Sequence, residues 1–360
     1  MKRSEYISEN VLENFSLSSG IAMKRHFVTI KDIARELGIS VATVSRALRD
    51  TYDVNQETRQ LVLNKAIEMN YKPNFNATAL VTNSSHNIGI VLPSITNYYF
   101  STVITGVQEV AYKKGYNIVL YITNDSAERE RDILKELSLG NIDGLLVCVS
   151  SSPGQNDHFE QIINDGIPIV FFDRVASDIK ASKVMQDDYE GAYQAVKHLI
   201  QQGYRKISHI AGPAGLLFTE KRMEGFLAAL KDHRLPVRKE WIIHSGFSRD
   251  FGGKDALELL KCRTKPDAIF AANDSKAIGA MLALKKKKVQ IGKQIGIIGF
   301  TNDPMCEIIS PSLTTVEEPA LEVGRKSCEF LLNHINKKGF QIQELTLPTR
   351  LIVRESTVRV

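Results

Sequence analysis

The stretch VTIKDIARELGISVATVSRAL, residues 28–48, decides the fold of the N-terminal part of the chain. Its first apolar residues recur at the spacing of a single helix face: Ile30, Ile33, Ala34 and Leu37. Thr29 can cap the start of this helix, and Gly38 can supply the left-handed residue that ends it. A second helix is expected to begin after Ser40. Two short helices joined by a tight glycine turn form a helix-turn-helix.

The second of these helices has the surface of a helix that reads DNA. Small and polar residues mark its outward face: Val41, Ala42, Thr43, Ser45 and Arg46. A recognition helix needs such side chains near its start in order to reach base edges. A third helix, capped by Asn55, is expected to complete a small core. A core of three helices with no ligand remains the alternative, because short helix pairs are common.

Three pieces of sequence make this pattern specific, namely residues 28–48, the motif V-N-x-x-T-R at 54–59, and Y-K-P-N at 71–74. Together they resemble the lactose/galactose-repressor (LacI/GalR) family, and the resemblance extends over residues 27–360. It implies that Val41, Ala42 and Arg46 face bases in the major groove, with Arg46 suited to a bidentate contact with guanine. It also implies a set of phosphate contacts that fix the register: Thr29, Ser40, Thr43, Asn55 and Thr58.

The segment after this domain would be an ordinary linker by composition, since it is too short to form a stable isolated helix. The resemblance implies instead a hinge helix that folds when two copies meet on DNA. Its expected residues are Asn74, Ala77, Thr78 and Ala79. Leu80 matches the apolar wedge that opens a base step in the minor groove. The family often has Arg or Gln where Thr78 and Ala79 stand, so minor-groove contact is expected to differ here.

The remaining residues alternate between Val/Ile-rich runs and helices of 10–15 residues, which is typical of parallel βαβ units. The pattern restarts near Tyr189, which indicates two α/β lobes. The resemblance implies a two-lobed, periplasmic-binding-protein-like domain whose lobes are joined by three crossovers. The expected divisions are a disordered extension over 1–22, the helix-turn-helix domain over 23–72, the hinge and linker over 73–86, and an effector-binding and dimerisation domain over 87–360. Within the last, the first lobe is expected over about 87–186 and 317–338, and the second over about 187–316 and 339–360.

Polar and aromatic residues follow several of the predicted strands, where ligands of such sheets bind. By resemblance, these positions line an effector cleft between the lobes: Ser94, Tyr99, Phe100, Asp173, Arg222, Asn273 and Thr301. Aromatic rings with Asp, Asn and Arg suit a sugar or a sugar derivative. Each residue also has a plain structural explanation, such as a surface ion pair or a helix cap. Thr301 stands where the family commonly has Asp, so we expect this position to bind the effector differently.

Composition limits the other classes of protein. The 360 residues carry 46 Lys and Arg against 41 Asp and Glu, which permits nucleic-acid binding without requiring it. No stretch is apolar enough for a membrane span, no export signal is visible, and the four Cys lie far apart. The adjacent acidic pairs 187–188 and 317–318 do not form acid/base couples, because neighbours on a strand point apart.

The sequence also shows no metal-ligand cluster, phosphate loop or nucleophile motif, so no catalytic residue, metal or cofactor is expected. We therefore expect a cytoplasmic, homodimeric transcription regulator, a repressor rather than an enzyme, with palindromic double-stranded operator DNA and a sugar-like effector as its partners. The alternatives are a periplasmic-type sugar-binding protein, which would need export, and an α/β enzyme, which would need a reactive group.

Overall fold

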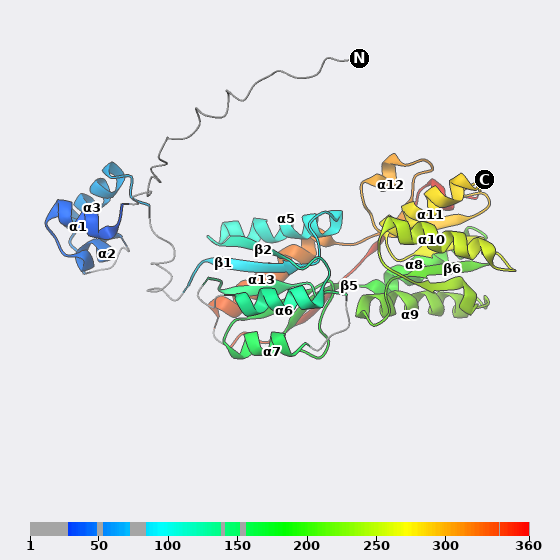
Figure 1. The fold of residues 1–360 in the computed structure, drawn as a ribbon, viewed down its shortest axis with the longest axis horizontal. Coiled ribbons are helices and arrows are strands. Elements are labelled where there is room, and N and C mark those ends of the chain that lie inside the picture. The colour runs from blue at the N-terminus through cyan, green and yellow to red at the C-terminus, as the bar shows by residue number, and fades with distance from the viewer. Residues whose placement is uncertain are drawn as a thin grey trace, which may run out of the picture. The chain divides into compact units, whose positions relative to one another are not determined.

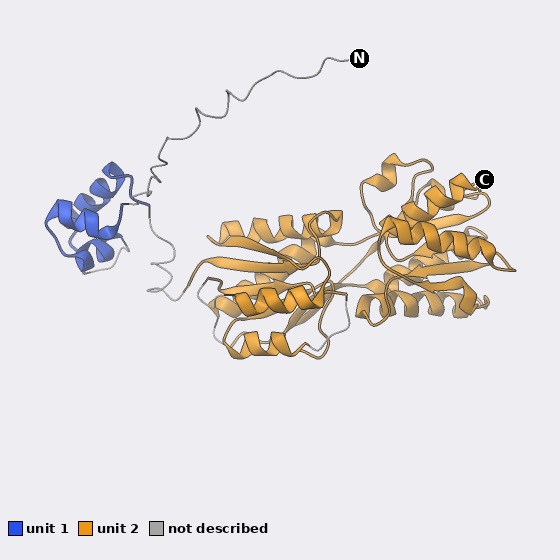
Figure 2. Cartoon of the chain, in the orientation of Figure 1, with its two compact units in different colours: residues 1–78 blue, residues 79–360 orange. Residues whose placement is uncertain are grey.

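The computed structural model describes residues 28–48, 53–72, 84–137, 141–151, 156–337 and 339–359. The chain forms two compact units, residues 1–78 and residues 79–360 (Figure 2). Two sets of expectations lie outside the described residues. They are the extension over 1–22 and the hinge residues Asn74, Ala77, Thr78, Ala79 and Leu80.

The first unit contains the expected helices α1 (Ile30–Leu37), α2 (Val41–Leu48) and α3 (Gln56–Glu68) (Figure 1). Gly38 ends α1 with a φ of 63°, the left-handed conformation that the sequence predicted. The helices enclose a small core of buried apolar side chains: Ile33, Ala34, Val44, Ala47, Val62 and Ala66. The helix-turn-helix fold is therefore confirmed.

The second unit begins with a six-stranded parallel sheet in the order β11-β5-β4-β3-β1-β2. Its strands are β1 (Asn87–Leu92), β2 (Asn117–Ile122), β3 (Gly144–Val147), β4 (Ile169–Phe172), β5 (Ser182–Gln186) and β11 (Glu344–Leu347). Its helices are α5 (Tyr98–Lys113), α6 (Ala127–Glu136), α7 (Asp157–Asn164) and α13 (Ala320–Asn336). One core packs α5 and α13 against the sheet, and a second core packs α6 and α7 against it.

A second six-stranded sheet has the order β12-β10-β9-β8-β6-β7, in which only β12 is antiparallel to its neighbour. Its strands are β6 (Ile207–Ala211), β7 (Ile242–His244), β8 (Ala268–Ala271), β9 (Gly296–Thr301), β10 (Thr314–Glu317) and β12 (Arg350–Ile352). Its helices are α8 (Asp188–Gln201), α9 (Leu217–Asp232), α10 (Arg249–Lys261), α11 (Asp274–Lys286) and the short α12 (Met305–Ile308). Two 3-10 turns, η1 (Lys239–Trp241) and η2 (Glu355–Thr357), complete this lobe. The cores pair α8 with α9 and α10 with α11 (Figure 1).

One expected boundary differs from the structure. The sequence placed residues 339–360 in the second lobe, but β11 pairs with β5 of the first sheet, with Glu344 opposite Lys183. The Lys183 ammonium also lies 2.9 Å from the Glu344 carboxylate. The chain therefore crosses between the sheets three times: after β5, after β10 and after β11. Three short crossovers therefore join the two sheets.

Among the described residues, no helix combines the length and the apolar character that crossing a membrane requires. The same residues contain no group of three or more His, Cys, Asp or Glu side chains placed to hold a metal ion.

Helices α10 and α11 cross so closely that the contact requires glycine. A Cβ on Gly279 would overlap the backbone carbonyl oxygen of Arg249 on the facing helix. A Cβ on Gly252 would overlap the backbone of Lys276 in the same way. Gly253 has more space, since its Cβ would lie 3.3 Å from the Gly279 carbonyl oxygen. The crossing therefore sets the position of α11, whose first residue follows a strand that ends at the cleft.

We predict that Gly279→Ala lowers the free energy of unfolding by about 1–3 kcal/mol, because the added methyl group forces the two helices apart. This loss outweighs the roughly 1 kcal/mol by which alanine favours an isolated helix. Gly253→Ala is the control and should leave stability unchanged or raise it slightly. Urea denaturation followed by circular dichroism compares the two variants, and equal stability of both would contradict the packing argument.

Candidate functional site

The surface of unit 1 presents the start and one face of α2. The Ser40 hydroxyl oxygen accepts the backbone N–H of Thr43 at 3.0 Å, which caps the helix. Val41, Ala42 and Arg46 are all exposed, and the Arg46 Nε donates to the Ala42 carbonyl at 3.3 Å. The three residues expected to face bases therefore share one solvent-facing surface.

The residues expected to contact phosphate sit at helix starts. The Asn55 side-chain oxygen accepts the backbone N–H of Thr58 at 2.7 Å at the start of α3. At the start of α1, the Thr29 backbone N–H and hydroxyl donate to the Asp32 carboxylate at 2.9 and 2.7 Å. Helix N-termini carry a positive partial charge and outward amides, so these positions suit phosphate oxygens.

In unit 2 the centre of the interlobe region is the guanidinium of Arg222 on α9, which is 3% exposed. Its Nε donates to the Asp188 carboxylate at 2.7 Å, and one terminal nitrogen donates to the Glu318 carboxylate at 2.6 Å. The other terminal nitrogen donates to the Ala272 carbonyl at 2.5 Å. The Phe300 ring lies beneath the guanidinium, with its centroid 3.6 Å away. Three segments far apart in sequence are therefore joined at one buried cation.

A chain of hydrogen bonds continues from this cluster into the first lobe. The Gln186 amide nitrogen, at the end of β5, donates to Asp173 at 2.9 Å and to Asp188 at 3.4 Å. The Tyr99 hydroxyl donates to the Gln186 oxygen at 3.3 Å. The Cys148 thiol lies 3.5 Å from the Asp173 carboxylate. We call Asp173, Asp188, Glu318 and Arg222 the carboxylate cluster, and it contains three acidic groups for one guanidinium.

Burial shifts the protonation of this cluster. Desolvation raises the pKa of Glu318 from 4.5 to about 8, although the Arg222 charge favours the ionised form. Desolvation raises the pKa of Asp188 from 3.8 to about 6 against the same opposing charge. Asp173 adds a like charge beside both. The cluster therefore holds protons at pH values where exposed carboxylic acids are ionised.

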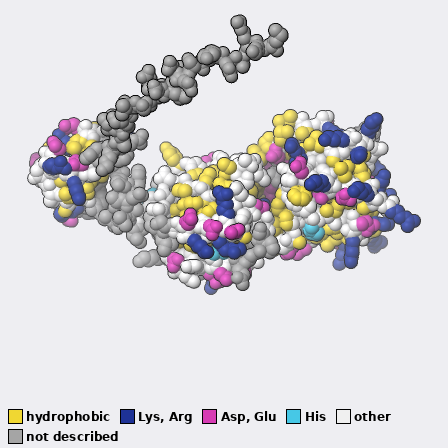
Figure 3. All heavy atoms as spheres, in the orientation of Figure 1, with side chains coloured by type: hydrophobic (Ala, Val, Ile, Leu, Met, Phe, Trp, Pro, Cys, Tyr) yellow, Lys and Arg dark blue, Asp and Glu magenta, His cyan; other side chains and the backbone are white. Residues whose placement is uncertain are grey.

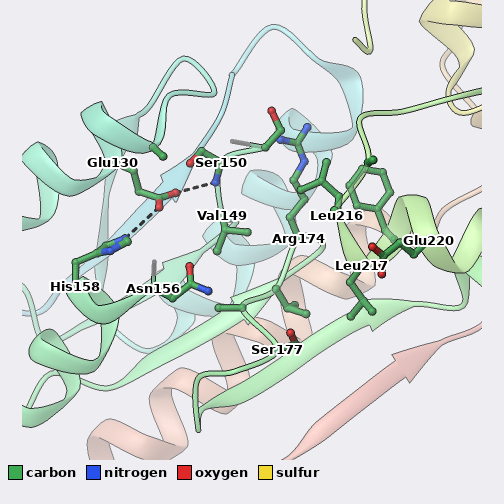
Figure 4. A pocket seen from close by; sticks show the side chains of 17 residues that line it. Glu130, Val149, Ser150, Asn156, His158, Arg174, Ser177, Leu216, Leu217 and Glu220 are labelled. Carbon is green, nitrogen blue, oxygen red and sulfur yellow. Dashed lines mark hydrogen bonds and ion pairs between the residues drawn. The ribbon is translucent and has the colours of Figure 1, made fainter. Parts of the chain in front are cut away.

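Two cavities lie in the interlobe region, and Glu318 of the cluster lines the second of them. The first, about 180 Å³, is lined by residues of both lobes, including Glu130, His158 and Arg174 from one and Phe218 and Glu220 from the other (Figure 4). In its wall His158 Nε2 lies 3.1 Å from Glu130, which also accepts the backbone N–H of Ser150 at 2.8 Å. The second cavity, about 370 Å³, is lined in part by Tyr99, Thr301 and Glu318.

The structure brings four of the expected effector residues together: Tyr99, Asp173, Arg222 and Thr301. Three others have local roles. Asn273 caps α11 through its side-chain oxygen and donates to the Phe247 carbonyl at 3.1 Å. Phe100 is buried in the core of the first lobe, and Ser94 bonds to Thr96 in a partly exposed turn. None of these three lines either cavity.

Sequence reasoning missed Asp188, Glu318 and Gln186. It noted the two acidic pairs and concluded that neighbouring side chains point apart, which the structure supports. Asp187 caps α8, while Asp188 turns to Arg222. Glu317 pairs with exposed Arg350, while Glu318 turns to Arg222. The usable signal was that each pair lies at the carboxyl end of a strand, where ligands of such sheets bind.

Comparisons with known proteins match both units. Residues 29–74 match the model of bacterial regulatory proteins of the lacI family, and residues 85–355 match periplasmic binding proteins and the sugar-binding domain of the LacI family. The HTH-type transcriptional repressor PurR of Vibrio parahaemolyticus serotype O3:K6 (strain RIMD 2210633) is 31% identical over 91% of this chain and 98% of its own length.

Two solved structures show the same architecture. A LacI family transcriptional regulator from Enterococcus faecium with bound ribose is 29% identical, covers 76% of this chain and 99% of its own, and has a TM-score of 0.67. The lac repressor dimer bound to operator and an anti-inducer has a TM-score of 0.81 at 24% identity, over 92% of this chain and 99% of its own.

The raised pKa of Glu318 predicts a stability that depends on pH. The folded state holds the Glu318 proton between pH 4.5 and about 8, where the unfolded chain releases it, so the free energy of unfolding falls as pH rises through this window. Glu318→Gln keeps a hydrogen-bonding group for Arg222 but removes the titration, and should flatten this fall. Glu317→Gln, which changes the half-exposed neighbour, should keep the wild-type slope. Urea denaturation at pH 5, 6, 7 and 8 measures all three proteins, and parallel curves would refute the assignment.

Proposed function

The chain belongs to the LacI family of bacterial regulatory proteins and is a DNA-binding repressor controlled by a small-molecule effector, and we propose which of its residues bind DNA and which bind the effector. The exposed face of α2 reads an operator, and the carboxylate cluster and the interlobe cavities bind a neutral, hydroxyl-rich effector such as a sugar. The observation that carries this proposal is the presence, in one chain, of a helix-turn-helix unit and a two-lobed unit with a polar interlobe centre.

The DNA contacts follow from the surface of unit 1. Arg46 projects from an exposed helix and can present two donors to the O6 and N7 acceptors of guanine. Val41 and Ala42 are apolar, so they contact thymine methyl groups or exclude bulk. The set expected to hold phosphates is Thr29, Ser40, Thr43, Asn55 and Thr58, which gives register without reading sequence.

The electrostatics of the cleft favour a neutral effector over a phosphorylated one. Each of the three nitrogens of the Arg222 guanidinium already donates to a protein acceptor. Three carboxylic acids lie around this guanidinium. An anion would therefore meet acidic groups and displace a buried ion pair, which is costly. Sugar hydroxyls, in contrast, both donate to carboxylates and accept from guanidinium. The Enterococcus faecium regulator holds ribose, and the CelR regulator was solved as a cellobiose complex.

We further propose that the protein acts as a homodimer in the cytoplasm on a near-palindromic operator. A two-fold protein matches two half-sites, and the hinge residues Asn74, Ala77, Thr78 and Ala79 would pair beside the Leu80 wedge in the minor groove. The lac repressor structure is a dimer on its operator. The effector then changes operator affinity through the arrangement of the lobes, with a coupling of typically 1–3 kcal/mol.

The alternatives have less support. A periplasmic-type sugar-binding protein would share the two lobes, but it has no use for the helix-turn-helix over 29–74. An α/β enzyme needs a nucleophile or an acid/base pair placed against a substrate. We propose that the cleft has no catalytic residue and that its ionisable groups serve binding.

Arg46→Ala tests the reading of α2. Because it removes a bidentate base contact, it should cost about 1–3 kcal/mol on the selected operator and relax the preference at one base pair in each half-site. Arg35→Ala, on α1 and paired with Asp32 at 2.6 Å, is the control that removes an equal charge. Fluorescence anisotropy with operators changed one base pair at a time gives the affinities. An equal loss on every sequence would argue against a base contact by Arg46.

A thermal-shift screen tests the effector class. Neutral pentoses, hexoses and disaccharides should include a ligand that stabilises the full chain, by about 2.7 kcal/mol at a hundredfold excess over its Kd. The matching sugar phosphates should give no shift, because the carboxylate cluster repels them. Asp173→Asn should weaken the shift, whereas Asp178→Asn, outside the cluster, should preserve it. Stabilisation by phosphates alone would overturn the proposed effector class.

A further inference from the structure

The second lobe carries a concentration of positive charge that the proposed operator and effector contacts do not use. It lies in the four segments that precede β6, β7, β8 and β9, at residues 202–206, 231–241, 261–267 and 285–295. These segments contain 14 Lys and Arg but only three Asp and Glu, whereas the whole chain has 46 and 41. Outside the four segments, acidic residues therefore outnumber basic ones.

The four segments lie together at one edge of the sheet. Strands β7, β6, β8 and β9 are consecutive neighbours and run parallel, so the segments that precede them emerge at the same edge. Contacts join the segments directly. Asp267 accepts the backbone N–H groups of Arg205 and Lys206, and the Trp241 indole donates to the Thr264 carbonyl at 2.9 Å. This edge is opposite the one that faces the cleft, because ligands of such sheets lie at the carboxyl ends of strands.

We call this surface the basic end, defined by the 14 cationic residues of the four segments: Arg205, Lys206, Lys231, Arg234, Arg238, Lys239, Lys261, Arg263, Lys265, Lys285, Lys286, Lys287, Lys288 and Lys293. All of them are exposed. Figure 3 shows Lys and Arg side chains, in dark blue, gathered at the end of the second lobe that carries α10 and α11.

Local structure accounts for only a few of these charges. Arg238 pairs with Glu240 at 3.4 Å, Lys261 with Glu258 at 2.6 Å, and Lys285 with the Ser310 carbonyl. Arg205 bonds to carbonyls at the end of α8. Within the described part of the chain, the other ten cationic side chains have no such partner. A helix C-terminus is stabilised by one or two nearby cations, so the dipoles of α9, α10 and α11 do not require this many.

The composition of the basic end identifies its partner as a polyanion with a regular backbone. Ten of the 14 residues are Lys, which bind phosphate as mobile point charges, and their concentration on one surface favours a polyanion. The aromatic residues of the segments, Tyr204 and Trp241, are buried, so no surface for stacking unpaired bases is present in the four segments. Val237 is their one large exposed apolar side chain, which leaves a protein partner without the anchors that protein interfaces use.

We propose that the basic end binds the phosphate backbone of a second segment of duplex DNA while unit 1 holds the operator. This inference rests on the DNA-binding function, which keeps the protein near a high local concentration of phosphate. Four adjacent strands span about 15 Å at their usual spacing, a length over which duplex DNA carries about nine charges. The contact reads no sequence, because ten of its 14 cations are Lys, which bind phosphate oxygens as point charges. A repressor with such a surface bridges two stretches of DNA.

A bridging experiment with the full-length chain tests this proposal. Operator duplex selected from a random library is fixed to beads and saturated with protein, and excess free operator occupies the remaining helix-turn-helix units. A fluorescent duplex of random sequence is then added at 50 to 200 mM salt. Wild-type protein should retain it at low salt and lose it steeply as salt rises, with a slope near −0.9 in log K per log salt for each phosphate contact.

The test variant is Lys286→Gln/Lys287→Gln/Lys288→Gln/Lys293→Gln, which changes four exposed side chains without a partner in the described structure. It should bind operator as the wild type does but reduce retention of the second duplex at least tenfold. The matched control removes the same charge from exposed lysines of the first lobe: Lys113→Gln/Lys114→Gln/Lys135→Gln/Lys180→Gln. The control should bridge as the wild type does.

Two outcomes overturn the proposal. Equal loss in both variants would show that only net charge matters, and absence of retention by the wild type at 50 mM salt would show that the surface does not bind duplex DNA. A failure of operator binding by the wild type would count instead against the function proposed for unit 1, so the two failures are distinguishable.

Discussion

The organisation of the two-lobed unit depends on the buried guanidinium of Arg222. Its three nitrogens donate to Asp188 at the first crossover, to Glu318 at the second crossover, and to the Ala272 carbonyl after β8. Removing one partner from a buried ion pair costs about 3–5 kcal/mol, because the remaining charge is left without compensation. The positions of the two crossovers are therefore coupled to a single side chain.

Burying these ionisable groups carries a desolvation penalty that a purely structural contact would not need. Three carboxylic acids share one guanidinium, and burial raises the pKa of two of them. Well-packed apolar residues would hold the lobes as firmly at lower cost. A polar centre has the advantage that a ligand can replace its hydrogen bonds one for one. These buried polar groups need hydrogen-bond partners, which either the protein or a ligand can supply. Such a region is suited to switching between two lobe arrangements.

Control of DNA binding then requires no direct contact between effector and DNA. If the effector prefers one arrangement of the lobes and DNA prefers one spacing of the paired hinges, the two binding events are linked thermodynamically and reciprocally. The first and second crossovers contribute Asp188 and Glu318 to the cluster. The third crossover connects β11, which pairs with β5 in the first sheet, to β12, which pairs with β10 in the second. A ligand at the cluster thus acts where the chain connects the lobes.

Local sequence was enough to predict the small domain and the class of the large one. In unit 1 the helix boundaries depend on caps and a glycine turn within a few residues, such as Asn55 and Gly38, so short-range patterns determine them. The alternation of apolar strands and helices likewise predicted two parallel α/β lobes. Tertiary structure alone decided that β11 joins the first sheet, because a four-residue strand pairs with whichever edge its crossover reaches. It also decided that Asp188 and Glu318, 130 residues apart and each next to an acidic neighbour, meet at Arg222, since only the fold determines which member of each pair faces the buried cation.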